Sequence, residues 1–195
     1  MFYMIKTNKK YNDIVRTAKD LFWKHGFKRV SVEEICQKAN VSKMTYYKHF
    51  PNKIELAKTI FNGVVSEGEK QFRLIMKEDS SAAEKMKKFI QLKINSTNNI
   101  SHEFLQDFYT GAESELKAYV EERTRVAWDV LIKDYKEAQK TGIFRKDFNP
   151  EFLFKAQNKL AEMLDDKSVT SMFDNQQDLI MEFANLLVYG IAPHK

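Results

Sequence analysis

The stretch that decides the fold is residues 31–53, SVEEICQKANVSKMTYYKHFPNK. Its first half predicts a short helix. Ser31 and Glu34 have the spacing of a capping box, in which the serine oxygen accepts a hydrogen bond from an early backbone amide and the glutamate side chain reaches back. Asn40 follows, and asparagine tolerates the left-handed conformation that ends many helices. A tight turn is therefore expected at residues 40–42.

A second short helix is expected after this turn. Ser42 is suited to cap it, and Pro51 ends it near Phe50, because a proline disfavours helical geometry in the residue before it. Two capped helices around a tight turn form a helix-turn-helix. In that motif the second helix lies in the DNA major groove and the first helix braces it.

The second helix has a core side and a solvent side. Tyr46 and Phe50 are four residues apart, so they share one face and are expected in the core. The other positions of residues 43–49 include cations, a hydroxyl, an imidazole and a phenol. Such side chains contact phosphates and base edges. Residues 43–49 therefore predict a DNA-reading surface; the alternative is a helical corner of this shape that binds no DNA.

Helix signals continue on both sides of this motif. Glycine and proline number 6 and 3 in 195 residues, which leaves few turn-forming positions between strands. Capping patterns recur at Asn52, Ser81 and Asn149, and Gly26 and Gly142 stand where helices stop. We expect an all-α protein of about nine helices.

Charge is distributed unevenly along the chain. Residues 1–60 contain 13 Lys/Arg and 5 Asp/Glu, whereas residues 61–195 contain 19 and 22. A basic segment joined to a mildly acidic one indicates polyanion binding by the first part and a different role for the second. The alternative is a solvated basic face without a partner.

Other residues argue against catalysis and metal binding. Cys36 is the only cysteine, which rules out an internal disulfide and a cysteine-only metal site. It is expected to be a small buried filler, with a redox role as the alternative. The four histidines are scattered, and no carboxylate or nucleophile has a spacing that suits catalysis. We expect no metal, no cofactor and no enzymatic activity.

The apolar stretches are short. The apolar stretch within residues 1–6 is too short for a signal peptide. The longest apolar stretch, residues 184–192, falls well below the roughly 18 residues that a membrane span needs. A cytoplasmic protein without a membrane partner is expected.

The segment from Ile14 to Phe61 resembles the DNA-binding domain of the TetR family of transcriptional regulators. The resemblance rests on A-x-x-L-F-x-x-x-G-F from Ala18 to Phe27 and on S-V-E-E-I, A-N-V-S-K, T-Y-Y-K-H-F and N-K after it. Residues 142–151, GIFRKDFNPE, also resemble the usual start of the family's penultimate helix. The resemblance implies a helix-turn-helix DNA-binding domain over residues 1–55 and a helical ligand-binding and dimerisation bundle over residues 56–195.

The resemblance also implies roles for individual residues. Tyr47 and Lys53 would hold phosphates. His49 and Ser31 would make supporting contacts with the DNA from the edges of the motif. Contacts to bases or nearby backbone would come from Lys43, Thr45 and Lys48. Many members have glycine where this chain has Asn40 and Met44. Asn40 is conformationally compatible, but Met44 adds a bulky apolar group to the surface that would read DNA, so the base preference of a known member does not transfer. A thymine methyl is a reasonable target for Met44. The candidate DNA-binding residues are Ser31, Lys43, Met44, Thr45, Tyr47, Lys48, His49 and Lys53.

The C-terminal bundle is rich in aromatic residues. Most of them are expected to be ordinary core, but apolar pockets with a few polar groups do form between bundled helices. Few charges lie among the candidate positions, so a neutral, lipophilic or aromatic inducer is expected. The candidate ligand-binding residues are Met86, Phe89, Phe104, Phe108, Tyr109, Trp128, Ile132 and Tyr135.

The last two long helices are expected to carry the dimer interface. They supply more apolar surface than one packing layer needs, and two helices from each subunit would form a four-helix bundle. Two-fold symmetry would then place two reading helices on a palindrome. The candidate interface residues are Leu153, Ala156, Leu160, Met163, Leu179, Phe183, Leu186 and Leu187.

Together these features predict a one-component regulator, a repressor that binds a near-palindromic operator in double-stranded DNA as a homodimer and is released by a small molecule. Two alternatives remain. One is a helical enzyme or small-molecule carrier with a vestigial DNA-binding head. The other is an architectural DNA protein without a ligand, which would not need a large aromatic second domain.

Overall fold

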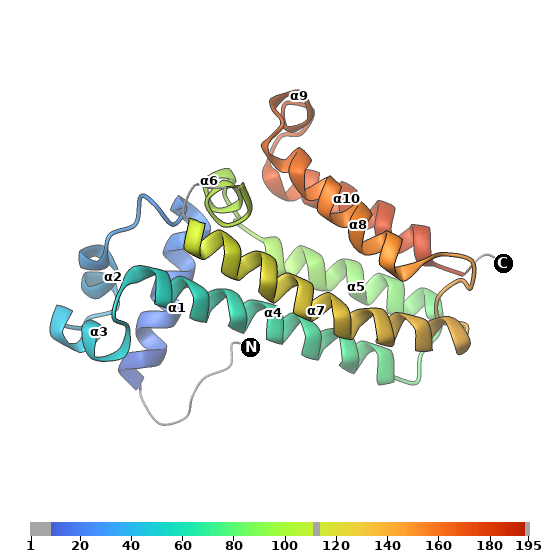
Figure 1. Ribbon diagram of the computed structural model, residues 1–195, viewed down its shortest axis with the longest axis horizontal. Helices are drawn as coiled ribbons and strands as arrows, with labels where there is room; N and C mark the ends of the chain where they lie inside the picture. Colours follow the sequence, from blue (N-terminus) through green and yellow to red (C-terminus); the bar gives the residue numbers. More distant parts are fainter. Residues whose placement is uncertain (1–8, 111–113, 194–195) are drawn as a thin grey trace. The chain divides into compact units, whose positions relative to one another are not determined.

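A computed structural model describes residues 9–110 and 114–193. Its described residues form α-helices and short turns of other helix types, without a strand, which confirms the all-α prediction (Figure 1). The described residues contain ten α-helices where about nine were expected, because the four-residue α9 had no distinct pattern in the sequence. The helices are α1 (Lys9–His25), α2 (Val32–Lys38), α3 (Lys43–His49), α4 (Lys53–Lys77), α5 (Ala82–Thr97), α6 (His102–Leu105), α7 (Ser114–Lys140), α8 (Pro150–Glu162), α9 (Lys167–Thr170) and α10 (Gln176–Ile191).

Two compact units account for the internal contacts of the chain. The first unit contains the described residues up to Glu67 together with the described part of 99–123. The second contains residues 68–98 and the described residues from Thr124 onward. Helices α4 and α7 each contribute to both units. None of the described helices has the length and hydropathy of a membrane span.

The core of the first unit forms around the apolar side of α1. Ile14, Ala18 and Phe22 are fully buried, as their helical spacing predicts. Tyr46 and Phe50 on and after α3 are also buried, which confirms their predicted place in the core. Burying an aromatic or large aliphatic side chain stabilises a fold by roughly 1.5–3 kcal/mol, so these residues hold α3 against α1.

Capping residues fix the ends of the short helices. The Ser31 and Ser42 hydroxyl oxygens accept hydrogen bonds from backbone amides three residues later, at 3.1 Å each. The capping box also predicts that the Glu34 carboxylate reaches back to the start of α2. The carboxylate instead forms an ion pair with the Lys38 ammonium group at 2.9 Å. Asn40 has φ of 53°, which confirms the left-handed residue between α2 and α3. The helix-turn-helix therefore forms where the sequence predicts it.

The second unit has its own core. Met86, Ala138, Phe144 and Ile191 form a buried cluster, and half-buried aromatic side chains pack around it. Helix α10 packs on α5 and also contacts α8. The Asn149 side chain caps α8 by accepting a hydrogen bond from the Phe152 amide at 3.0 Å, as predicted.

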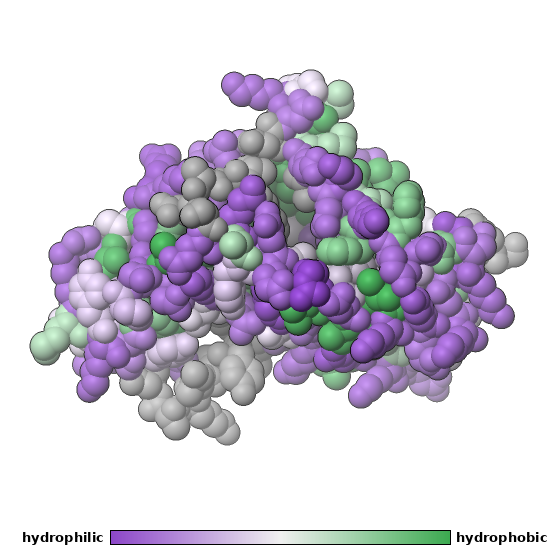
Figure 2. Space-filling model, viewed as in Figure 1, coloured by the Kyte–Doolittle hydropathy of each residue, from purple (hydrophilic) through white to green (hydrophobic). Residues whose placement is uncertain are grey.

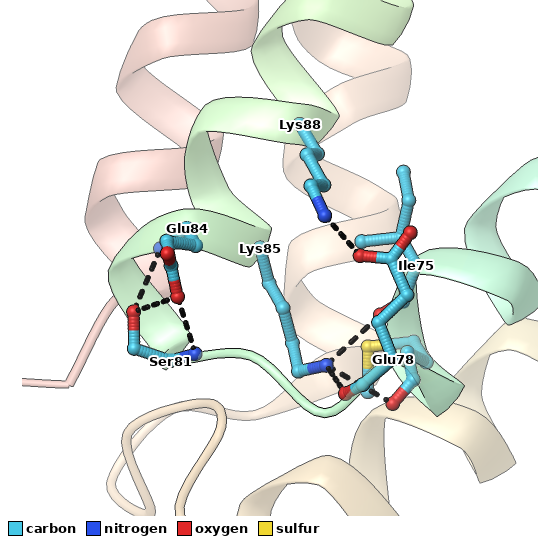
Figure 3. Close-up of polar contacts among 7 residues, drawn as sticks. Ile75, Glu78, Ser81, Glu84, Lys85 and Lys88 are labelled. Carbon is cyan, nitrogen blue, oxygen red and sulfur yellow. Dashed lines mark hydrogen bonds and ion pairs between the residues drawn. The ribbon is translucent and has the colours of Figure 1, made fainter.

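A buried lysine joins α4 to α5 in this unit. The Lys85 side chain is 2% exposed, and its ammonium group donates to the carbonyl oxygens of Ile75 at 2.9 Å, Met76 at 3.3 Å and Glu78 at 2.5 Å (Figure 3). These carbonyls lie at the C-terminal end of α4, where backbone acceptors lack helical partners. Lys85 therefore caps α4 from the next helix.

Candidate functional site

The solvent side of α3 presents a mixed polar and apolar surface. Met44 and Tyr47 are 83% and 53% exposed, and Lys43 and Lys48 are exposed as well. Thr45 and His49 are half-buried at the edges, and Ser31 is exposed at the start of α2. Met44 is therefore a largely exposed apolar side chain on a short helix. We call Lys43, Met44, Thr45, Tyr47, Lys48 and His49 the reading face.

An ion pair joins the two helices of the motif. The Lys43 ammonium group, in the first turn of α3, donates a hydrogen bond to the Glu33 carboxylate on α2. This bond holds the pKa of the Glu33 carboxyl below its usual value and raises the pKa of the Lys43 amine. Lys43 therefore carries its charge with one partner already in place on the bracing helix.

The edges of the reading face rest on neighbouring side chains. The Thr45 and Ser42 hydroxyl oxygens are 3.0 Å apart, so Thr45 takes part in the cap of α3. The Tyr11 ring of α1 stacks on Phe50 at 5.1 Å between centroids and meets the His49 ring edge-on at 5.8 Å. Tyr11 was not among the predicted residues, although its place three residues before Ile14 sets it on the buried side of α1.

Lys53, expected to hold a phosphate, has protein partners. Its ammonium group donates to the carbonyl oxygens of Phe27 and Val30 at 2.8 Å each and lies 4.3 Å from the centroid of the Phe27 ring. Both carbonyls belong to the segment between α1 and α2. A lysine in the first turn of α4 opposes the helix dipole, and these contacts give it a structural role there.

Two of the candidate ligand residues belong to the core of the first unit. The Phe104 ring stacks on Phe108 at 4.4 Å and packs on Trp23 at 4.2 Å. Phe108 also contacts the rings of Phe27 and Phe61. We therefore reassign Phe104 and Phe108 from the ligand site to the aromatic core of the first unit, because α1 and α4 already cover their rings. The Tyr109 side chain lies outside the described residues.

The buried carboxylate of Asp107 joins the helical turn Gln106–Thr110 to the residues that follow α1. No pattern in the sequence indicated this contact. The Asp107 carboxylate is 8% exposed, accepts a hydrogen bond from the Lys28 amide at 2.9 Å and pairs with the Lys28 ammonium group at 3.5 Å. Gly26 has φ of +78°, and a Cβ atom there would lie 2.8 Å from an Asp107 carboxylate oxygen. The close approach requires glycine at this position.

The other candidate ligand residues lie in the second unit. Met86 and Trp128 are buried, and Phe89, Ile132 and Tyr135 are half-buried. Phe89 stacks on Phe72 at 5.1 Å, and the Tyr135 ring contacts Phe72 at 5.5 Å and Trp128 at 5.8 Å. Burial raises the pKa of the Tyr135 hydroxyl. Phe89, Phe72, Tyr135 and Trp128 therefore form one row of aromatic contacts within the unit.

The candidate interface residues are unequally exposed. Leu186 and Met163 are 59% and 37% exposed, whereas Leu179 is 1% exposed and belongs to the core of the second unit. The remaining candidates, Leu153, Ala156, Leu160, Phe183 and Leu187, are half-buried. Two exposed aromatic residues were missed, Phe152 at 71% and Tyr189 at 61%. Figure 2 shows a mostly hydrophilic visible face with apolar residues gathered where α8 and α10 lie.

Comparisons with known proteins agree with this geometry. The family model described as "Bacterial regulatory proteins, tetR family" matches residues 14–60. Among curated proteins, no sequence matches the chain.

Solved structures share the fold over nearly the whole chain. The fatty acid degradation regulator FadR from Bacillus halodurans is 19% identical, with a TM-score of 0.70 over 97% of this chain and 100% of that one. Reduced NemR from E. coli is 13% identical, with a TM-score of 0.71 over 96% and 99%. FadR from Bacillus subtilis in complex with stearoyl-CoA is 19% identical, with a TM-score of 0.62 over 93% and 99%.

Proposed function

Because this chain is a member of the TetR family of bacterial regulatory proteins, we propose that it is a repressor that binds a near-palindromic operator as a homodimer and is released by a small lipophilic or aromatic molecule. DNA binding is assigned to residues 1–55, and ligand binding and dimerisation to residues 56–195. The observation that carries the proposal is the reading face: α3 is held by a buried core on one side and exposes Met44, Tyr47 and Lys48 on the other.

The chemistry of the reading face matches a DNA groove. Lys48 supplies a positive charge and Tyr47 a hydroxyl for phosphate oxygens, which fix the position of a protein on DNA without reading sequence. Met44 offers an apolar surface for a thymine methyl group, and Lys43 has donors for guanine acceptors. Ser31, Thr45 and His49 would make supporting contacts with the DNA from the edges of the reading face. Lys53 reaches a phosphate only if it leaves its carbonyl partners.

The proposed dimer uses α8 and α10. Helix α10 buries Leu179 and Ile180 in its own subunit and leaves Leu186 and Tyr189 exposed. An apolar helix face without a partner in its own chain is suited to pack against a second copy. The symmetric copy would present two reading faces to the two halves of an operator.

The proposed ligand site lies among the half-buried aromatic rings of the second unit. Phe72 contacts both Phe89 and Tyr135 there, and Trp128 continues the row beyond Tyr135. An aromatic lining favours an apolar ligand. A similar fold is found in Bacillus subtilis FadR, which was solved with stearoyl-CoA.

A gel-shift experiment with DNA upstream of the protein's own gene tests DNA binding. Lys43→Ala and Met44→Gly should each change which operator variants are preferred, by roughly 1–3 kcal/mol for a lost base contact. Lys38→Ala is the matched control, because Lys38 is also an exposed lysine paired with a glutamate but lies on α2. If the variants weaken binding to all sequences equally, the reading face is assigned incorrectly. If the unmodified protein shifts no upstream DNA, the proposed function fails.

A further inference from the structure

A hollow on the first unit lies between the end of α1 and the start of α2. It has a volume of about 210 Å³, and its lining residues are His25, Arg29, Val30 and Glu34. His25 is the last residue of α1, and Glu34 lies in the first turn of α2. Val30 is 1% exposed, whereas the Arg29 side chain is exposed. The hollow therefore brings a guanidinium group and an imidazole together at an accessible surface.

The backbone that carries Arg29 is held from two sides. Lys28, the residue before it, donates its amide hydrogen to the Asp107 carboxylate at 2.9 Å. Val30, the residue after it, accepts a hydrogen bond at 2.8 Å through its carbonyl oxygen from the Lys53 ammonium group. A side chain on a backbone that is already fixed loses less freedom when it binds a partner. The segment therefore presents the guanidinium group from a preorganised position.

The charges around the hollow favour an anion. Glu34 contributes a carboxylate to the lining, but this carboxylate is paired with the Lys38 ammonium group at 2.9 Å. Among the described residues, none accepts a hydrogen bond from the Arg29 guanidinium group or forms an ion pair with it. Arg29 thus supplies a positive charge that no described carboxylate balances, and the His25 imidazole supplies an N–H donor.

A guanidinium group is well matched to a phosphate. Its planar fork donates two parallel hydrogen bonds to two phosphate oxygens, whereas an ammonium group acts as a point charge. In a helix-turn-helix the first helix crosses the DNA backbone while the second lies in the major groove. The hollow lies at the start of that first helix, α2. The phosphates that pass this helix are therefore those of the DNA backbone.

We propose that this hollow binds a phosphate group of the operator backbone, with Arg29 donating to two phosphate oxygens and His25 donating a further hydrogen bond. The inference rests on the proposed DNA-binding function and adds a site outside the reading face. It also gives Lys53 a positioning role, because this lysine holds the segment that carries Arg29. Phosphate contacts carry no sequence information, so the site should strengthen binding to all DNA sequences alike.

Fluorescence anisotropy of the full-length protein tests the site, with the upstream operator duplex and a random duplex at several salt concentrations. Arg29→Ala should weaken binding to both DNAs about tenfold and reduce the slope of log affinity against log salt by about one. Arg29→Lys should keep the slope, because the charge remains, but recover only part of the affinity, because an ammonium group lacks the paired donors. Lys24→Ala is the matched control, since Lys24 is an exposed cation in the last turn of α1 that does not line the hollow. It should leave affinity and slope unchanged.

A scan with single methylphosphonates locates the phosphate. Each substitution removes the charge of one phosphate in the upstream duplex. At least one position should weaken binding of the unmodified protein but not of Arg29→Ala, because the variant has already lost that contact. His25→Ala should lower the affinity about threefold, and only while that phosphate keeps its charge.

The outcomes separate this site from the proposed function. Unchanged affinity and salt slope in Arg29→Ala, or an equal loss in Lys24→Ala, would overturn the site while operator binding by the unmodified protein stands. Calorimetry with inorganic phosphate tests the other source of this chemistry. Arg29-dependent binding of inorganic phosphate without a change in DNA affinity would overturn the assignment to the DNA backbone. Thermal unfolding confirms that each variant is folded, and an unmodified protein that binds no operator DNA would overturn the proposed regulatory function itself.

Discussion

The Glu33 carboxylate accepts a hydrogen bond from the Lys43 ammonium group, so the bracing helix α2 holds the first side chain of α3. A phosphate or a base that binds Lys43 competes with this carboxylate. The negative charge of Glu33 also lies beside the surface proposed to meet DNA. Glu33 therefore limits the strength with which the reading face attracts a polyanion.

Glu33→Gln should strengthen DNA binding by releasing Lys43 and removing a negative charge. Removal of the negative charge should raise the affinity for operator and random DNA alike and steepen the slope of log affinity against log salt by about one. Release of Lys43 to the bases should raise the affinity for operator further. Fluorescence anisotropy with both DNAs at several salt concentrations measures this. Glu34→Gln is the control, because Glu34 pairs with Lys38 away from α3. An unchanged salt slope in Glu33→Gln would show that this pair does not restrain Lys43.

Lys53→Ala should destabilise the first unit. The substitution leaves the Phe27 and Val30 carbonyl oxygens without the donor that the structure gives them. We expect a loss of about 1–3 kcal/mol in the free energy of unfolding, measured by urea denaturation. Lys24→Ala, at an exposed lysine in the last turn of α1, should change the stability little. A Lys53→Ala protein of unchanged stability with weaker binding to all DNA sequences would instead support the phosphate contact.

Gly26→Ala should destabilise the protein more than Gly142→Ala. Both glycines have positive φ, so an alanine costs roughly 1–2 kcal/mol at either position. At Gly26 the new Cβ would also approach Asp107 and Glu103 within 3 Å. At Gly142, no described residue other than its chain neighbours comes within 4 Å of the new Cβ. Thermal unfolding of the two variants compares the costs. Equal losses would mean that the Asp107 segment moves away freely.

Leu186→Glu should produce monomers that fold normally. The side chain is 59% exposed in its own subunit, so the substitution leaves the core intact. A glutamate buried at the proposed interface should weaken dimerisation by about 3 kcal/mol, or roughly a hundredfold. Light scattering gives the mass of each species. Met172→Glu, at an exposed apolar residue just after α9, is the control and should remain dimeric. A monomeric unmodified protein at micromolar concentration would contradict the proposed dimer.

Local chemistry predicted the helix-turn-helix well. The caps at Ser31 and Ser42, the left-handed Asn40 and the buried Tyr46 each depend on residues within a few positions of one another, so the sequence pattern contains the needed information. The split between the core and solvent sides of α3 follows from helical spacing alone. The start of α8 at Pro150 could be predicted for the same reason.

Long-range packing could not be predicted in this way. Phe104 and Trp128 have similar aromatic surroundings in the sequence, yet their rings belong to different units. The burial of Lys85 depends on the end of α4, which no local pattern reveals. The contact between Asp107 and Lys28 joins residues 79 positions apart. Such contacts are set by the tertiary arrangement.

The buried thiol of Cys36 has a practical consequence. It is the only cysteine in the sequence, it is 5% exposed on α2, and burial raises its pKa, so little of the reactive thiolate is present at neutral pH. A maleimide or iodoacetamide reagent reaches it only when α2 detaches transiently from α1. The rate of alkylation of the unmodified protein therefore reports opening of the helix-turn-helix, and bound operator DNA should slow that rate without any engineered label.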